Sequence, residues 1–300
     1  MDRFTLKAPA KLNLMLGVSP TIIGGKHLLT SVFSTIELSD ELSFSFEDTK
    51  PRQIAIEVTS SSGIPPLDLP IEQNMVYKAV CALEKVCSRA LDGHLSILVE
   101  KSIPHEAGLA GGSTDAAVTL LALSKLWGID PLGAPVLEAA AQLGADVLFF
   151  LHGGCALMGG DGGTLLRQLT QPSMDLVLVK PNAGISTAAA YKAFDADPQP
   201  IPSYQRLLDL LETEDTSVEL IAGELANNLT KAACLLLPGL APLIDEVAAQ
   251  KGVYTALLAG SGSTVFGVCE NAGVAAELAA RFSQKGYWAA ATSTAQRSHR

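Results

Sequence analysis

Hydrophobic and polar positions alternate strongly over residues 4–16. Alternation with a period of two predicts a β-strand. Leucines occupy one face of this strand, whereas Lys11, Asn13 and Met15 fall on the other. Taken alone, Lys11 and Asn13 fit either a solvated strand edge or a lysine that projects into a cleft beside a hydrogen-bonding amide.

The same kinds of pattern predict further strands and helices along the chain. The predicted strands cover residues 31–36, 41–46, 54–58, 95–99, 175–180, 254–258, 265–269 and 288–292. The predicted helices cover residues 74–86, 116–127, 135–143, 204–212, 218–224, 240–250 and 272–282, while residues 59–70 and 195–202 have the composition of loops. Because strands and helices interleave without a regular βαβ repeat, we expect an α+β fold in two domains, residues 1–160 and 161–300.

The composition narrows the class of protein. Of the 300 residues, 48% are hydrophobic and 17% are charged, which suits a folded chain with a sizeable core. The formal net charge of −10 argues against broad binding to nucleic acids or anionic membranes. The sequence shows no signal-peptide pattern and no apolar run of membrane length, and its five cysteines are scattered without a CxxC pair. We therefore expect a cytoplasmic protein with reduced cysteines and no permanent metal site; monomer and weak homodimer both stay open.

A glycine-rich segment links a predicted strand to a predicted helix. Residues 104–117 read Pro-His-Glu-Ala-Gly-Leu-Ala-Gly-Gly-Ser-Thr-Asp-Ala-Ala. The glycines allow the backbone to pass close to a ligand. We expect Ser113, Thr114 and Asp115 to cap the helix, whose N-terminus suits an anion such as a nucleotide phosphate. The chain contains neither a Walker A sequence nor GxGxxG, and an ordinary glycine turn is the alternative interpretation.

Two other segments have two interpretations each, and a third, around His27, has one default interpretation. Asp146, set in an apolar run, is either the cap of a short helix or a general base in a dry site. Residues 260–264 are either a hairpin turn between two strands or a second small-residue loop that packs against phosphates. His27 follows two glycines and Lys26 in a predicted loop, where a solvated side chain is the default.

Taken together and in order, these segments resemble the GHMP kinase superfamily almost from end to end. The segments that carry the resemblance are Pro9-Ala10-Lys11-Leu12-Asn13-Leu14, residues 108–117, Leu143-Gly144-Ala145-Asp146-Val147, Asn227-Asn228-Leu229 and residues 260–267. The resemblance implies a two-domain GHMP kinase fold, with an N-terminal ribosomal-protein-S5-like domain that binds ATP and a C-terminal ferredoxin-like domain that binds substrate.

Within the superfamily, the resemblance is closest to kinases that act on 4-diphosphocytidyl-2-C-methyl-D-erythritol in the non-mevalonate route to isoprenoid precursors. It implies transfer of the γ-phosphoryl group of ATP, bound with Mg²⁺, to a hydroxyl of that small molecule. An alcohol is a poor nucleophile, so such a transfer depends on positioning and charge stabilisation.

The resemblance also assigns residues to roles. Asp146 matches the catalytic base and Lys11 its partner. The residues matched to ATP binding are Asn74, Lys101, Pro104, Gly108, Leu109, Ala110, Gly111, Gly112, Ser113, Thr114 and Asp115. The residues matched to substrate binding are Asn13, His27, Thr187, Tyr191, Gly260 and Ser261.

The chain departs from the usual family pattern at three places. Lys26 stands where the family has a tyrosine that stacks on cytosine, Leu148 replaces a proline, and residues 160–163 lack a glutamate. Lys26 is either a solvated lysine or a group that contacts an aromatic ring or a substrate phosphate. The alternative functions are another GHMP-fold alcohol kinase, of homoserine or mevalonate type, and a nucleotide-binding protein without catalysis.

Overall fold

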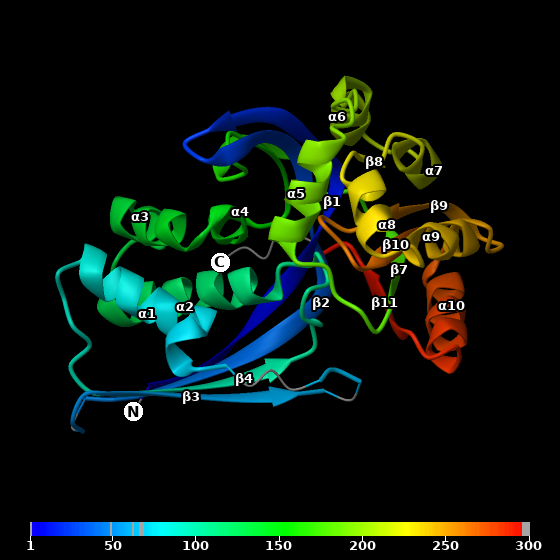
Figure 1. Cartoon of the computed structure of the whole chain (residues 1–300). Coiled ribbons are helices and arrows are strands. Elements are labelled where there is room, and N and C mark those ends of the chain that lie inside the picture. Colours follow the sequence, from blue (N-terminus) through cyan, green and yellow to red (C-terminus); the bar gives the residue numbers. More distant parts are fainter. Residues whose placement is uncertain (1, 49, 62, 66–68, 296–300) are drawn as a thin grey trace. The chain divides into compact units, whose positions relative to one another are not determined.

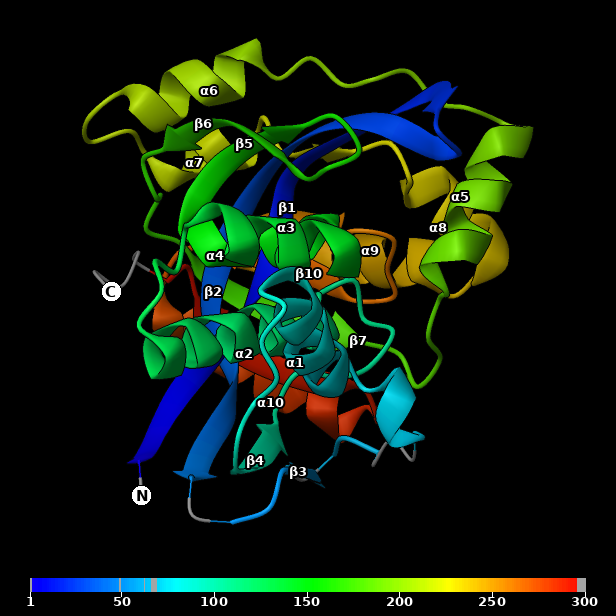
Figure 2. The ribbon, with the colours of Figure 1, turned by 90° about the vertical axis from the view of Figure 1, so that its left-hand side faces the viewer.

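The computed structural model describes residues 2–48, 50–61, 63–65 and 69–295, which form two compact units (Figures 1 and 2). Unit 1 comprises Met1–Ala10, Leu38–His105 and Ala110–His152. Unit 2 comprises Lys11–Glu37, Glu106–Leu109 and Gly153–Arg300. Each unit is thus assembled from chain segments that alternate along the sequence. The expected domain boundary at residues 160 and 161 stays a prediction.

Unit 1 is a sheet with helices on one face (Figure 1). Its strands are β3 (Gln53–Ser60), β4 (His94–Lys101) and the parts of β1 (Asp2–Ile23) and β2 (Lys26–Glu47) that belong to this unit. Strand β4 pairs in parallel with β3 and antiparallel with β2, where Leu42 lies opposite Val99. Besides the short 3₁₀ helix Ile71–Gln73, the helices are α1 (Met75–Val86), α2 (Gly111–Trp127), α3 (Ala134–Leu143) and α4 (Ala145–His152).

Unit 2 contains two sets of paired strands. In the first, β1 pairs with β8 (Ala226–Asn227), β2 with β5 (Cys155–Gly159), and β5 with β6 (Thr164–Leu169). In the second, antiparallel neighbours follow the order β11 (Trp288–Ser293), β7 (Asp175–Lys180), β10 (Val265–Cys269) and β9 (Val253–Leu258). The helices are α5 (Thr187–Ala196), α6 (Gln205–Glu212), α7 (Val218–Ala222), α8 (Thr230–Leu236), α9 (Leu240–Ala248) and α10 (Ala272–Gln284).

A hydrophobic core holds the second sheet of unit 2 against its helices. Val177 and Val265 of the sheet are fully buried, and Val247 of α9 and Phe282 of α10 pack into the same cluster. Burying a large aliphatic or aromatic side chain contributes about 1.5–3 kcal/mol each, so this cluster stabilises the sheet that carries the loop at residues 260–264.

Most periodic segments form the elements that the sequence predicts. The bounds of β7 and β10 agree residue for residue, and α1, α3 and α10 agree within two residues at each end. The two strands expected at 31–36 and 41–46 are wrong as separate elements, because β2 runs continuously through both. Among the described residues, three strands (β5, β6 and β8), two α-helices (α5 and α8) and the short 3₁₀ helix were not expected at all. Asp195, expected to start a linker, belongs to α5.

No helix within the described part of the chain is both long enough and apolar enough to span a membrane. The predicted loop at 59–70 is wrong for Thr59 and Ser60, which end β3; part of the rest falls outside the described residues, and its last residue precedes the 3₁₀ helix.

Candidate functional site

Lys11 and Asn13 form a buried polar chain on β1, within unit 2. Nζ of Lys11 donates to Oδ1 of Asn13 at 2.8 Å, and Nδ2 of Asn13 donates to Oγ of Ser31, also at 2.8 Å. The Ser31 hydroxyl in turn donates to the carbonyl of Met15 at 2.6 Å. Because Lys11 and Asn13 are only 5% and 2% exposed, the interpretation as a solvated strand edge is wrong. A lysine ammonium only donates, and Nδ2 of Asn13 donates to Ser31, so these two contacts orient the Asn13 amide with its oxygen toward Lys11.

The turn between β9 and β10 packs against this chain and against residues 106–109, all within unit 2. Ser263 and Thr264 donate backbone N–H groups to the carbonyls of Glu106 and Ala107 at 3.3 and 3.2 Å. A Cβ at Gly260 would lie 3.3 Å from Nζ of Lys11. The segment is therefore a hairpin turn. Because Gly260 has no side chain, it also leaves room for the ammonium of Lys11.

Gly108 is required where these two loops touch. Its φ is +77°, and a Cβ there would lie 1.9 Å from the carbonyl oxygen of Ala259. L-residues rarely adopt that φ, and no side chain fits a gap of that size. The next residue, Leu109, is buried and accepts the backbone N–H of Lys11 at 3.2 Å.

Helix α5 of unit 2 brings together four of the residues predicted to bind substrate. Oγ1 of Thr187 lies 3.1 Å from Oγ of Ser261, and the Tyr191 ring lies 5.2 Å from the His27 ring between centroids. His27 belongs to β2 rather than to a loop, and its side chain is only 9% exposed. The expectation of a solvated loop histidine is therefore wrong.

Lys26, the neighbour of His27, is exposed, as expected for a lysine in contact with solvent. Its Nζ also pairs with Oδ2 of Asp161 at 2.6 Å. Asp161 lies in residues 160–163, so two of the departures from the family pattern pair with one another. The hydrogen bond from Lys26 lowers the pKa of the Asp161 carboxyl.

In unit 1, α2 begins at Gly111 rather than after Ser113, Thr114 and Asp115. Its N-cap is Ala110, in the left-handed region with φ 60°, and no side chain caps the helix. The capping role expected for those three residues is therefore wrong. A Cβ at Gly111 would lie 3.0 Å from Ile103 and 3.3 Å from Nζ of Lys101, so the glycine brings a cation close to the helix N-terminus. The first turn of a helix presents N–H groups without intrahelical partners, which suits an anion.

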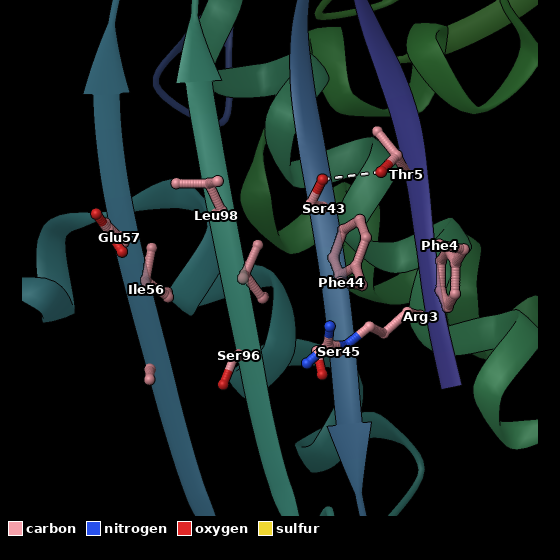
Figure 3. Close-up of a pocket in the computed structure, with 12 residues that line it drawn as sticks. Arg3, Phe4, Thr5, Ser43, Phe44, Ser45, Ile56, Glu57, Ser96 and Leu98 are labelled. Carbon is pink, nitrogen blue, oxygen red and sulfur yellow. Dashed lines mark hydrogen bonds between the residues drawn. The ribbon is translucent and has the colours of Figure 1, made fainter. Parts of the chain in front are cut away.

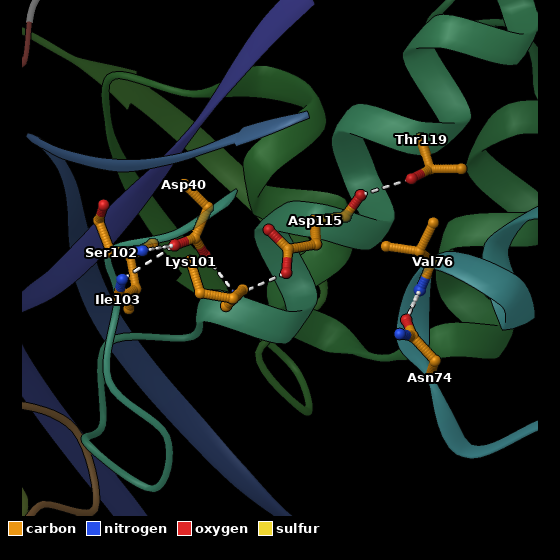
Figure 4. Close-up of polar contacts among 8 residues, drawn as sticks. All are labelled: Asp40, Asn74, Val76, Lys101, Ser102, Ile103, Asp115 and Thr119. Atoms are coloured by element: carbon orange, nitrogen blue, oxygen red, sulfur yellow. Dashed lines mark hydrogen bonds and ion pairs between the residues drawn. The ribbon is translucent and has the colours of Figure 1, made fainter. Parts of the chain in front are cut away.

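A buried ionic network supports this helix N-terminus (Figure 4). Nζ of Lys101 pairs with carboxylates of both Asp40 and Asp115, the latter at 2.6 Å. Oδ1 of Asp40 also accepts the backbone N–H groups of Ser102 and Ile103, at 2.5 and 2.8 Å. Asp40 was missed from the sequence, where a lone acid within a long strand has no local signature. The network joins β2, the end of β4 and α2.

Burial and the charges of neighbouring groups shift the pKa values of this network in opposite directions. Burial raises the pKa of Asp115 to about 7, although the Lys101 ammonium opposes the rise. Burial lowers the pKa of Lys101, but the charges of Asp115 and Asp40 more than offset it, so that pKa is raised. Lys101 is therefore held as a cation.

Three further residues that the sequence predicts for the site, Asn74, Pro104 and Asp146, lie in unit 1 outside the ionic network. Asn74 is the N-cap of α1, and its Oδ1 accepts the backbone N–H of Val76 at 2.9 Å. Pro104 is buried in the segment that follows β4. Asp146 lies within the first turn of α4 rather than capping it. The positive end of the helix dipole stabilises a negative carboxylate at such a position.

A cavity of about 620 Å³ lies elsewhere in unit 1, over β1 to β4 (Figure 3). Arg3, Thr5, Ser43 and Glu57 are among its lining residues, and Oγ1 of Thr5 lies 2.8 Å from Oγ of Ser43. None of the residues predicted to bind ATP or substrate lines it. Its serines and threonine are typical of the solvated face of a sheet.

Comparisons with known proteins place the chain in a family. The model of the GHMP kinases N-terminal domain matches residues 74–154, and that of the C-terminal domain matches residues 207–287. A protein from Moorella thermoacetica named 4-diphosphocytidyl-2-C-methyl-D-erythritol kinase is 36% identical over 95% of this chain and 96% of its own. The protein of that name from Bacillus pumilus is 35% identical over 89% of both chains. The chain belongs to the GHMP kinase family.

Solved structures agree with this assignment. The crystal structure of a 4-(cytidine 5'-diphospho)-2C-methyl-D-erythritol kinase matches this GHMP kinase with a TM-score of 0.76 and 30% identity, covering 97% of this chain and all of that one. A homoserine kinase from Cytophaga hutchinsonii matches with a TM-score of 0.69 and 18% identity, covering 99% of this chain and 95% of that one, which shows a shared fold alone. The α+β, two-domain GHMP kinase fold expected from the sequence is therefore confirmed.

Proposed function

We propose that this GHMP kinase transfers the γ-phosphoryl group of ATP to a hydroxyl of 4-diphosphocytidyl-2-C-methyl-D-erythritol. The observation that carries the proposal is its 36% identity, over 95% of the chain, to a relative named for that reaction. The buried Lys11–Asn13 pair supports it, because an oriented ammonium can stabilise negative charge on a phosphoryl group during transfer.

We assign the chemistry to Asp146 and Lys11. Asp146 accepts the proton of the substrate hydroxyl as the alcohol attacks, which contributes typically about 10²–10⁴-fold to such reactions. The Lys11 ammonium, oriented by Asn13, stabilises negative charge on the reacting oxygens. The N-terminus of α2, with Lys101 beside it, receives the phosphates.

We expect Mg²⁺ to bind together with ATP, where it would supply positive charge against that of the phosphates. The residues around the first turn of α2 fit such an ion. Among the described residues, Thr114 Oγ1 and Asp115 Oδ1 are buried atoms with no hydrogen-bond partner, and both are oxygen ligands of the kind that Mg²⁺ prefers.

We assign substrate binding to residues of α5 and β2. Thr187, Tyr191 and His27 supply a hydroxyl and two rings in one unit, and Tyr191 offers an aromatic face for a pyrimidine base. The enzyme is expected to work in the cytoplasm, in keeping with its five free cysteines.

An acceptor panel assayed with ATP tests the proposal. The purified enzyme is offered the cytidine-linked methylerythritol, homoserine and mevalonate at equal concentration, and ADP release is measured with product detection by mass spectrometry. We expect turnover of the cytidine-linked acceptor alone. Phosphorylation of homoserine or mevalonate without turnover of that acceptor would reassign the substrate, and ATP binding without any turnover would favour a non-catalytic protein.

A further inference from the structure

Both ring nitrogens of His27 have an oxygen neighbour: Nδ1 makes a hydrogen bond, and Nε2 lies within ion-pair distance of a carboxylate. Nδ1 lies 2.9 Å from the carbonyl oxygen of Ser19, and Nε2 lies 3.1 Å from Oδ1 of Asp195. A carbonyl oxygen only accepts, so Nδ1 carries a proton. Nε2 then either donates a second proton to the Asp195 carboxylate or accepts one from its carboxyl. In both cases Asp195 determines what Nε2 does.

Asp195 is the third residue of a row along α5. Thr187, Tyr191 and Asp195 follow one another at intervals of four, which places them on the same face of the helix. Thr187 contacts Ser261, Tyr191 contacts the His27 ring, and Asp195 holds its Nε2. This face of α5 therefore joins the turn after β9 to the β1–β2 hairpin.

The ring of His27 is closely packed between these contacts. Its centroid lies 5.2 Å from that of Tyr191 and 6.1 Å from that of Phe194, with the latter ring edge-on. Since the His27 side chain is almost buried, the bond from its Nε2 is shielded from solvent on the imidazole side. The Asp195 side chain is 46% exposed, so the contact is half-buried, with its imidazole side packed and its carboxylate side open to solvent.

We infer that Asp195 is a positioning residue, which holds the His27 imidazole at Nε2 so that His27 and Tyr191 present one fixed surface to the nucleoside part of the substrate. The inference rests on the proposed function, because it takes the substrate to be cytidine-linked. Without Asp195 the imidazole keeps its bond to Ser19 but loses the restraint on its other nitrogen, so that packing alone sets the tilt of its ring against Tyr191.

The chain offers a matched control two residues away. Asp197, the C-cap of α5, pairs with Nζ of Lys231 at 2.6 Å, and both side chains are exposed. Asp197→Ala therefore removes a carboxylate and an ion pair from the same end of α5. An exposed pair of this kind contributes about 0–1 kcal/mol.

The test compares Asp195→Ala, Asp195→Asn and Asp197→Ala in the full-length enzyme. Binding of cytidine 5'-diphosphate is measured by calorimetry, and kcat and both KM values by steady-state kinetics. For Asp195→Ala we expect the Kd for cytidine 5'-diphosphate and the KM of the cytidine-linked acceptor to rise about tenfold, with kcat and the KM of ATP within about twofold. Asp195→Asn, whose amide can accept from a protonated Nε2 or donate to a neutral one, should recover most of the loss, and Asp197→Ala should match the unaltered enzyme. Equal losses in Asp195→Ala and Asp197→Ala, or parallel changes in kcat and in the KM of ATP, would overturn the inference.

Nitrogen-15 NMR of the His27 side chain separates this inference from the proposed function. The Nε2 resonance should move in Asp195→Ala and stay in Asp197→Ala, whether or not any acceptor is turned over. An unmoved resonance in an enzyme that phosphorylates the cytidine-linked acceptor would refute the role of Asp195 and leave the function standing. A moved resonance in an enzyme that phosphorylates no such acceptor would refute the function and the substrate surface together, leaving only the contact.

Discussion

Nζ of Lys11 and Oδ1 of Asn13 lie 2.8 Å apart on one face of β1, so a cation and an amide two residues apart act as a single buried unit. The Lys11 ammonium also lies over the Phe33 ring, 5.1 Å from its centroid. An amide oxygen and an aromatic face orient a cation without neutralising its charge. The amide oxygen of Asn13 and the ring of Phe33 therefore orient the lysine ammonium.

Replacing Lys11 should remove catalysis with little loss of fold. Lys11→Met keeps the length of the side chain and removes the charge, so we expect kcat to fall by about 10²–10³ because charge stabilisation in the transition state is lost. Steady-state kinetics and circular dichroism measure the two effects. Lys7→Met, on the same strand but exposed, is the control and should keep its activity. Full activity in Lys11→Met would contradict the role of this lysine.

Replacing Asp146 should separate binding from chemistry. Asp146→Asn keeps the shape of the side chain but cannot accept the hydroxyl proton, so we expect kcat to fall by about 10²–10⁴ while the Kd for ATP stays within about threefold. Calorimetry and single-turnover assays give the two quantities. Glu219→Gln alters another acid in the first turn of a helix and should change neither. Turnover by Asp146→Asn at the level of that control would exclude Asp146 as the base.

An alanine at Gly108 should destabilise the protein by about 3 kcal/mol, because a strained φ and an overpacked contact act together. The cause is the approach of 1.9 Å that a Cβ would make to the Ala259 carbonyl. Thermal unfolding of Gly108→Ala measures the change. Gly128→Ala is the matched control: its φ is +66°, but a Cβ there has nothing within 4 Å. The control should lose only about 1 kcal/mol, and equal losses in the two variants would show that the contact has no effect.

Asp115 should make the protein less stable as the pH rises toward neutrality. Burial raises its pKa from 3.8 to about 7, so between these values the folded chain keeps a proton that the unfolded chain has released. The free energy of unfolding then falls with rising pH, by at most about 1.4 kcal/mol per unit for one group. Denaturant unfolding at several pH values should show this slope in the unaltered protein and a shallower one in Asp115→Asn. Asp161→Asn is the control, because the lowered pKa of Asp161 places its effect below this window. The same slope in Asp115→Asn as in the unaltered protein would contradict the raised pKa.

Local periodicity was sufficient to predict elements whose two ends are marked by the residues next to them in the sequence. Strands β7 and β10 were predicted with their observed bounds, since a short apolar run flanked by polar residues or glycine marks both ends of a strand. The continuity of β2 through residues 37–40 was not predictable in this way, because strand pairing on either side of that stretch comes from distant segments, β5 and β4.

The sequence by itself determined the family and the order of the motifs, because each motif is a contiguous string of residue types, and it predicts which residues carry the chemistry. Only the tertiary structure decided what surrounds them. Asp40, Lys101 and Asp115 meet in one network although they lie far apart in the chain, and His27 meets Asp195 in the same way. The burial and the charge of a partner act through space, so a single-sequence pattern does not contain them.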